Sequence, residues 1–179
     1  TVNIFTTIDT RINRSSSEQN DMIENEFWNM ISLLELVLAH NKLEEPQSIH
    51  NISYFTEQIY KEVQLNYPKL NISDEEIENL SKLATIHDIG KLFTPYEILN
   101  KKGKLTKDEM DIIKKHPLNG ANMALKLPKC GKASKLVQYA YNICLYHHER
   151  YDGQGYPKGL IGDEIPLCAQ VVGLADAYE

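Results

Sequence analysis

Residues 73–91 read SDEEIENLSKLATIHDIGK, and this stretch holds both a helix signal and a candidate site. Ser73 followed by Glu76 is the pattern of a capping box, in which each side chain accepts a hydrogen bond from the other residue's backbone N–H at a helix start. Apolar residues then recur at helical spacing, at Ile77, Leu80 and Ala84. His87 comes three residues after Ala84, so it continues the buried face near the helix's C-terminal end.

The rest of the chain repeats this helical spacing of apolar residues. Four further stripes are recognisable, within residues 23–38, 52–63, 133–144 and 167–178. A second capping box, Thr106 to Glu109, starts another helix, which Pro117 ends or bends. We find no alternating strand pattern of convincing length. The sequence therefore predicts an all-α fold of six or seven helices, with a long loop rich in glycine and proline at 149–166.

The length of 179 residues fits one ordinary domain. Residues 1–17 are rich in Thr, Ser, Asn and Arg without a useful period, so we expect a linker or the remnant of an upstream domain there. Residues 18–179 are expected to form the domain itself. Because the chain stops at Glu179, directly after an apolar helical stripe, we expect a truncated last helix, an incomplete C-terminal part and a more open substrate side.

The net charge of −6, from 19 basic and 25 acidic side chains, argues against a nucleic-acid polymer as partner. The net charge does not exclude a local basic pocket that binds one small phosphate ligand. No apolar run reaches the roughly 18 residues of a membrane span, and no signal peptide opens the chain. We therefore expect a cytoplasmic protein, with an upstream membrane or sensor domain in a larger signalling protein as an open alternative.

The three cysteines are odd in number and lack the CxxC spacing of metal or redox motifs; they are Cys130, Cys144 and Cys168. Cysteine without such a motif usually behaves as a small buried hydrophobe. We expect three buried, reduced thiols, which fits a reducing compartment.

Two more histidines share the position of His87 behind an apolar stripe. His116 follows Ile113 by three residues, and His147 follows Cys144 by three. Several imidazoles in one core are unfavourable unless something pairs their nitrogens. A metal cluster is the simplest pairing, and imidazole with carboxylate suits iron, manganese, nickel or zinc.

Neighbouring pairs extend this cluster. Adjacent residues on a helix point about 100° apart, so His87 with Asp88 and His147 with His148 favour two ions, with Asp88 bridging them. Asp176 is an isolated carboxylate in an apolar helix and needs a partner, either a metal or the backbone. Gly173, three residues earlier, allows close approach. His40 ends the first long helix, where an ordinary residue at the negative helix end is expected.

These residues lie in motifs that resemble the HD-GYP group of the HD phosphohydrolase superfamily. The motifs are HDIGK (87–91), KKHPLNG (114–120), HHERYDGQGYP (147–157), GLIGDEIPL (159–167) and the ADAY of 175–178. The resemblance spans about residues 23 to 179, and the ordered set with its long GYP loop is highly specific. It implies an HD-domain helical bundle with two divalent metal ions, iron or manganese first and nickel or zinc as alternatives.

The resemblance also implies a phosphodiesterase that cuts cyclic di-GMP to pGpG, GMP or both. The metal ligands carried over by position are His50, His87, Asp88, His116, His147, His148 and Asp176. Asp88 and Lys91 are the implied catalytic residues, and Lys91 and Tyr156 the implied substrate contacts. Two metals lower the pKa of a bridging water, and the hydroxide then attacks phosphorus in line while Lys91 offsets the developing charge.

Some positions depart from the family pattern. A Glu that serves a third metal in relatives would stand four residues before His50, where this chain has Pro46. The nearby Glu44 and Glu45 are displaced, which favours a two-metal site. Gln170 replaces a common Arg and Glu179 a common Asp, and both changes concern substrate orientation.

The sequence leaves the roles of some side chains near the GYP motif, and the exact function, open. Glu149 either orients a ligand histidine or is an ordinary surface residue. Tyr151 or Tyr156 either stacks on a guanine or packs the loop.

The alternatives to cyclic di-GMP hydrolysis are an HD phosphohydrolase for another cyclic dinucleotide or nucleotide, and a catalytically weak sensor or docking domain for diguanylate cyclase domains. A homodimer is a further open alternative.

Overall fold

The computed structural model describes residues 4–129 and 131–179, with side chains from Ser16 onward, and these residues form helices and loops. The α-helices are α1 (Ile4–His40), α2 (Pro46–Asn66), α3 (Asp74–Ala84), α4 (Tyr96–Leu99), α5 (Lys107–Ile113), α6 (His116–Ala124), α7 (Lys132–Tyr146) and α8 (Leu167–Tyr178). Three short 3-10 helices are η1 (Pro68–Leu70), η2 (Ile89–Phe93) and η3 (Gly162–Glu164). Seven α-helices have at least seven residues, and the prediction of an all-α bundle is confirmed.

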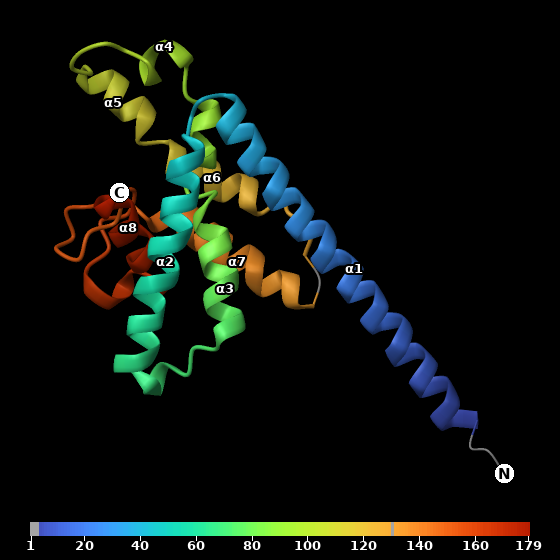
Figure 1. The fold of residues 1–179 in the computed structure, drawn as a ribbon. Coiled ribbons are helices and arrows are strands. Elements are labelled where there is room, and N and C mark those ends of the chain that lie inside the picture. The colour runs from blue at the N-terminus through green and yellow to red at the C-terminus, as the bar shows by residue number, and fades with distance from the viewer. Residues whose placement is uncertain (1–3, 130) are drawn as a thin grey trace.

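Helix α1 is longer than the sequence pattern indicates. The apolar stripe within residues 23–38 predicted a helix there, but α1 begins at Ile4, so residues 4–17 are helical too. The N-terminal part of α1 projects away from the other helices (Figure 1). Its C-terminal part packs on the domain through the buried Phe27, Ile31 and Leu38. That residues 1–17 are a linker or the remnant of an upstream domain stays a prediction, and the structure adds that the segment is helical from Ile4 onward.

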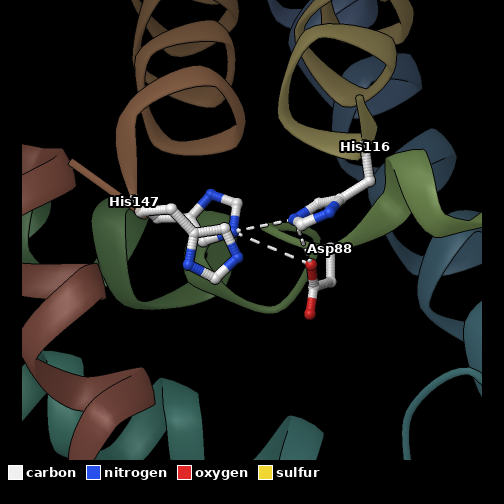
Figure 2. A group of neighbouring side chains, drawn as sticks. Asp88, His116 and His147 are labelled. Carbon is white, nitrogen blue, oxygen red and sulfur yellow. Dashed lines mark hydrogen bonds and ion pairs between the residues drawn. The ribbon is translucent and has the colours of Figure 1, made fainter. Parts of the chain in front are cut away.

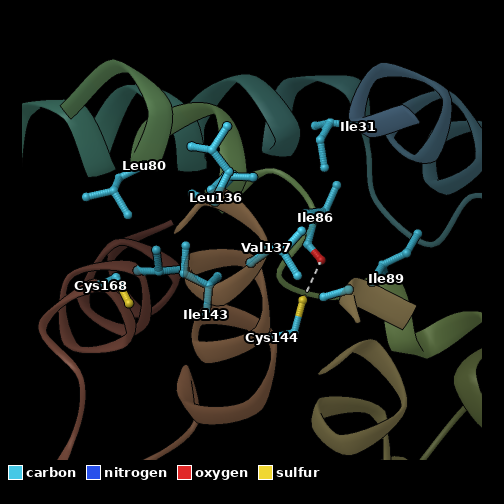
Figure 3. Close-up of a cluster of buried hydrophobic side chains, with 14 of the residues drawn as sticks. Ile31, Leu80, Ile86, Ile89, Leu136, Val137, Ile143, Cys144 and Cys168 are labelled. Carbon is cyan, nitrogen blue, oxygen red and sulfur yellow. Dashed lines mark hydrogen bonds between the residues drawn. The ribbon is translucent and has the colours of Figure 1, made fainter. Parts of the chain in front are cut away.

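The core lies between α3 and α7, with α1, α2, α6 and α8 around them. Figure 3 shows Leu80 of α3 facing Leu136 and Ile143 of α7. Helix α3 starts as expected, since Ser73 Oγ accepts a hydrogen bond from Glu76 N at 3.1 Å. The Glu76 carboxylate does not complete the capping box, because it accepts a hydrogen bond from Tyr139 Oη of α7. It therefore joins α3 to α7.

Two of the cysteines are buried free thiols, as predicted. Cys144 Sγ lies 3.4 Å from the carbonyl oxygen of Ile86 (Figure 3). Burial raises the pKa of Cys168 to about 12 and that of Cys144 as well, so both stay protonated and unreactive at neutral pH. Cys130 lies outside the described residues.

The buried face of α8 differs from the predicted stripe. Leu174 and Tyr178 were expected on it, but they are 58% and 74% exposed. The buried residues are instead mostly small: Cys168, Ala169, Val171, Val172 and Ala175. A Cβ atom added at Gly173 would lie 2.4 Å from the carbonyl oxygen of His147. The close approach of α8 to the end of α7 therefore decides which face is buried, and the small residues permit it.

No helix in the described part of the chain is both long enough and apolar enough to span a membrane.

Candidate metal centre

The histidines predicted behind apolar stripes are buried and follow helix ends, as expected, but only His147 lies directly at the end of its helix. His147 is the C-cap of α7, as predicted. His87 and Asp88 lie beyond the end of α3, in the turn that leads into η2. His116 is the first residue of α6 rather than the end of α5. The reason is Pro117, which lacks an N–H and fits the first turn of a new helix, where that N–H has no partner anyway.

The rings of His87, His116 and His147 each make the same kind of hydrogen bond to the backbone. In each, Nδ1 lies 2.8–3.0 Å from the carbonyl oxygen of the residue three positions earlier. These carbonyls belong to Ala84, Ile113 and Cys144. A carbonyl oxygen only accepts, so Nδ1 carries the hydrogen and Nε2 of the neutral ring presents a lone pair. The turn of chain before each histidine thus prepares it to bind a cation through Nε2.

These Nε2 atoms converge on Asp88. Its Oδ1 lies 2.9 Å from His116 Nε2 and 3.7 Å from His147 Nε2, and the two nitrogens are 3.3 Å apart. Figure 2 shows the two rings reaching Asp88 from different helices. All three residues are at least 96% buried, and Asp88 Oδ1 has no hydrogen-bond donor in the described part of the chain.

A buried carboxylate oxygen without a donor is rare and unfavourable. Here it faces imidazole lone pairs, which cannot donate either, and a cation would satisfy all of them together. Ligand atoms of four residues lie within 4.8 Å of one another: Asp88, His116, His147 and His148. The donor set therefore fits a divalent metal ion.

A second group of potential ligands shares Asp88 with the first. Ligand atoms of Glu44, His87 and Asp88 also lie within 4.8 Å of one another. Asp88 Oδ2 lies 3.3 Å from His87 Nε2, and Asp176 Oδ1 lies 3.6 Å from the same nitrogen. The two carboxylate oxygens of Asp88 thus face different histidines, as a bridging ligand requires. Glu44, which the sequence suggested was displaced, reaches this second group.

Lys91 lies beside both carboxylates of the second group. Its Nζ contacts Asp88 Oδ2 and lies 3.0 Å from Glu44 Oε1. Burial favours the neutral amine, but the charges of Asp88 and Glu44 outweigh it and raise the pKa of Lys91. The structure therefore holds a charged ammonium at the cluster, on the side predicted for it, although η2 carries it rather than an α-helix.

The charges within the cluster separate the histidines into two kinds. Burial opposes a charge on His87, but the Asp88 carboxylate prevails and raises the pKa of His87 to about 10. Burial also opposes the charge of Asp88, yet the charged His87 beside it lowers the pKa of Asp88 well below the usual value. Burial lowers the pKa of His147, and that of His148 to about 3, so both rings are neutral and ready to act as ligands at pH 7.

Two further predicted ligands lie at different distances from this cluster. Asp176 of α8 reaches His87, as described. His50 is an exposed residue of α2 and belongs to neither group of potential ligands among the described residues. Its role as a ligand stays a prediction. His40 is exposed at the end of α1, where an ordinary residue was expected.

Glu149 has a role that neither predicted alternative describes. Its carboxylate accepts hydrogen bonds from three successive backbone N–H groups, those of Lys158, Gly159 and Leu160, at 2.6, 3.2 and 3.0 Å. It therefore anchors the loop of residues 149–166, and in the described part of the chain it makes no hydrogen bond to a histidine. Sequence spacing could not reveal this, because the contacts span nine to eleven residues of irregular loop.

The GYP loop returns to the cluster through Tyr156. Its ring stacks on His148 with centroids 4.7 Å apart and planes at 26°, and Lys114 Nζ lies 5.2 Å from the Tyr156 centroid. Tyr151 is 67% exposed and lies against Gly162. Of the two tyrosines, Tyr156 is thus the one at the site. A hollow beside the cluster is lined by Lys114, His147, His148, Tyr156 and Asp176, among others.

Comparison with known proteins gives one family match. The family model described as HD domain matches residues 50–179. The Xanthomonas campestris protein named cyclic di-GMP phosphodiesterase response regulator RpfG is 40% identical over 127 residues, which cover 71% of this chain and 32% of that protein.

Two further relatives differ in the activity that their names give. A Thermotoga maritima protein named cyclic di-GMP phosphodiesterase is 29% identical over 156 residues, 87% of this chain and 39% of its own. A Vibrio cholerae protein named 3'3'-cGAMP-specific phosphodiesterase 2 is 33% identical over 108 residues, 60% of this chain and 20% of its own. The chain spans between a fifth and two fifths of the length of these three relatives.

Proposed function

Because this chain belongs to the HD domain family and is of the HD-GYP type, we propose that it is a metal-dependent phosphodiesterase that hydrolyses cyclic di-GMP to pGpG, GMP or both. The observation that carries the proposal is the buried Asp88 Oδ1, which has no donor among the described residues and faces the Nε2 atoms of His116 and His147. Such a site suits a cation, and a metal cluster suits the hydrolysis of a phosphodiester.

Two divalent ions fit the two groups of ligands. Asp88, His116, His147 and His148 would hold one ion, and His87, Asp88 and Asp176 the other, with Glu44 as an additional carboxylate. Imidazole and carboxylate donors suit iron, manganese, nickel or zinc, and the resemblance to the HD-GYP group puts iron or manganese first. When bound, such a pair supplies Lewis-acid activation of the phosphate and lowers the pKa of a water molecule.

The chain's own residues supply the rest of the chemistry. Asp88 fixes the spacing of the two ligand groups, because each of its oxygens faces a different one. Lys91 provides an ammonium that can offset the negative charge developing on the phosphoryl oxygens. The hollow beside the cluster carries Lys114 and Arg150, and these cations suit a ligand with two phosphate groups.

The identity of the cyclic dinucleotide rests on the relatives. Two of the three relatives described are named for cyclic di-GMP and one for 3'3'-cGAMP. Cyclic di-GMP is therefore the first candidate and 3'3'-cGAMP the second. A cytoplasmic location, a diguanylate cyclase domain as partner and a homodimer belong to the same proposal and stay predictions.

The proposal is tested by anaerobic turnover with Mn²⁺ or Fe²⁺, with cyclic di-GMP and 3'3'-cGAMP as parallel substrates and products separated by chromatography. We expect hydrolysis of cyclic di-GMP that Asp88→Asn abolishes. The matched control is Asp111→Asn, which changes an exposed carboxylate of α5 and should leave turnover intact. Faster turnover of 3'3'-cGAMP would favour the second substrate. Tight Mn²⁺ binding without turnover of either would favour a sensor domain.

A further inference from the structure

His148 is held differently from the other histidines of the cluster. His87, His116 and His147 each donate from Nδ1 to a carbonyl oxygen of the preceding turn. Among the described residues, neither ring nitrogen of His148 takes part in a hydrogen bond of this kind, and its ring makes contacts with aromatic rings instead. A metal ligand whose second nitrogen lacks an orienting partner needs another constraint on its ring.

Tyr156 supplies such a constraint. Its ring stacks on that of His148, with centroids 4.7 Å apart and an interplanar angle of 26°. Its backbone N–H also donates to the carbonyl oxygen of His148 at 3.2 Å. Ring and backbone of Tyr156 thus both contact His148, whose ring nitrogens have no hydrogen-bond partner among the described residues, and stacking restricts rotation of the imidazole plane.

The loop holds Tyr156 in this position through Glu149. The GYP tripeptide is Gly155-Tyr156-Pro157, and residues 158–160 follow it directly. Their backbone N–H groups donate three hydrogen bonds to the Glu149 carboxylate, which fixes this part of the loop to the end of α7. On the near side, the backbone of Gly155 lies so close that an added Cβ would be 2.4 Å from Glu149 Cα and 2.3 Å from Arg150 N. Tyr156 therefore sits between two fixed points of the loop.

We infer that Glu149 and Tyr156 are positioning residues for His148: the carboxylate anchors the loop, and the loop presses the tyrosine ring onto the imidazole so that it stays a metal ligand. In this arrangement the two ends of the motif 147–157, His147-His148-Glu149 and Gly155-Tyr156-Pro157, act together to orient one metal ligand. It rests on the proposed function only in assuming that His148 binds a metal ion.

The inference differs from a substrate role for Tyr156 in what each residue should affect. A tyrosine that only stacks on a guanine would change the KM for the dinucleotide and leave metal affinity alone. A tyrosine that positions His148 would change metal affinity with no substrate present. Removal of an outer partner of a metal ligand typically weakens metal binding by about 10- to 100-fold.

The test is calorimetric titration of the metal-free full chain with Mn²⁺ alone. Tyr156→Leu removes the stack and should weaken Mn²⁺ binding about 10- to 100-fold, whereas Tyr156→Phe keeps the stack and should bind as the wild type does. Glu149→Gln should also weaken binding, because its amide N–H₂ would face a backbone N–H donor.

Two matched controls lie in the same loop. Tyr151→Leu removes an exposed tyrosine whose ring lies beside Gly162, and Glu164→Gln changes a carboxylate that accepts an N–H from Ile161 at 2.9 Å. Both should keep wild-type Mn²⁺ affinity. Circular dichroism verifies that each variant folds, and if Tyr156→Leu does not fold, the comparison of Glu149→Gln with Glu164→Gln decides.

Wild-type Mn²⁺ affinity in folded Tyr156→Leu and Glu149→Gln would overturn the inference, and a raised KM in Tyr156→Leu alone would then identify a substrate contact. Because the titration contains no dinucleotide, weakened Mn²⁺ binding in these variants supports the inference even if the chain hydrolyses no cyclic di-GMP.

Discussion

Oδ1 of Asp88 lies 2.9 Å from Nε2 of His116, at a distance where a hydrogen bond would be expected, yet Nδ1 of His116 already donates to Ile113. In the neutral ring no hydrogen lies between the two atoms. Two acceptors buried this closely repel each other unless a cation joins them. The contact therefore has the geometry expected of two ligands of one metal ion.

Asp88→Asn should weaken the binding of both proposed metal ions. The amide keeps the shape but loses the charge, and its N–H₂ group would point at one of the two ligand groups. The loss of Mn²⁺ affinity should exceed the roughly 10- to 100-fold that removal of an outer partner costs. Metal analysis after dialysis measures it, with Asp111→Asn as control. Retention of two equivalents of Mn²⁺ by Asp88→Asn would contradict the bridging role.

Lys91→Gln should separate catalysis from metal binding. The variant removes the ammonium beside Asp88 and Glu44 but no metal ligand, so Mn²⁺ affinity should stay or rise. Loss of a group that stabilises transition-state charge lowers kcat by about 10²- to 10³-fold. Steady-state kinetics and titration together test this. A variant with normal kcat and a higher KM would show that Lys91 only binds substrate.

Gly90→Ala should destabilise the domain and disturb His116. An added Cβ would lie 1.9 Å from the His116 carbonyl oxygen, which belongs to fixed backbone. Overpacking of this kind costs about 1–3 kcal/mol, and a backbone clash this severe should reach at least the upper end of that range. Gly120→Ala is the milder comparison, because its added Cβ would lie 3.2 Å from Cys144 Cβ and 3.3 Å from Gly90 N, distances that a small shift relieves. Urea unfolding measures both; equal stability of the two variants would show that η2 and α6 can separate freely.

The metal-free domain should be most stable near pH 6.5. The pKa of His148 falls from 6.5 to about 3 on folding, so the unfolded chain binds a proton that the folded chain does not, and stability is lost as the pH falls through this window. The pKa of His87 rises from 6.5 to about 10, so its contribution is full below pH 6.5 and is lost as the pH rises toward 10.

Urea unfolding in EDTA between pH 4.5 and 9 measures this profile. His87→Gln should flatten the alkaline side and leave the acid side in place. Saturation with Mn²⁺ should flatten the alkaline side too, because His87 then holds a metal instead of a proton. A stability that rises steadily to pH 9 in the metal-free wild type would contradict the assignment of the proton to His87.

Much of the helical framework was predictable because its signals are local. The three-residue spacing from Ala84, Ile113 and Cys144 placed three histidines on the core side, and it holds even though 3-10 turns replace α-helix at His87. A one-turn spacing survives such changes, since the side chain still returns to the same face. The same spacing turned out to join each ring to its carbonyl partner.

Other features depend on contacts that no spacing encodes. Glu149 reaches backbone amides nine or more residues away through an irregular loop. Glu44 reaches Lys91 across 47 residues because the turn before α2 lies against η2. Leu174 points outward because Gly173 packs closely against His147. The spacing of hydrophobic residues cannot predict such a contact between two helices. These contacts depend on the tertiary structure, which can override the preferences of the local sequence.

The most direct test of the central claim is anomalous scattering from crystals of the Mn²⁺-loaded protein. Two peaks that share Asp88 are expected, one in contact with His116, His147 and His148 and the other with His87 and Asp176. A map without a peak at Asp88, or with a single peak that leaves His116 and His147 without a metal, would contradict it.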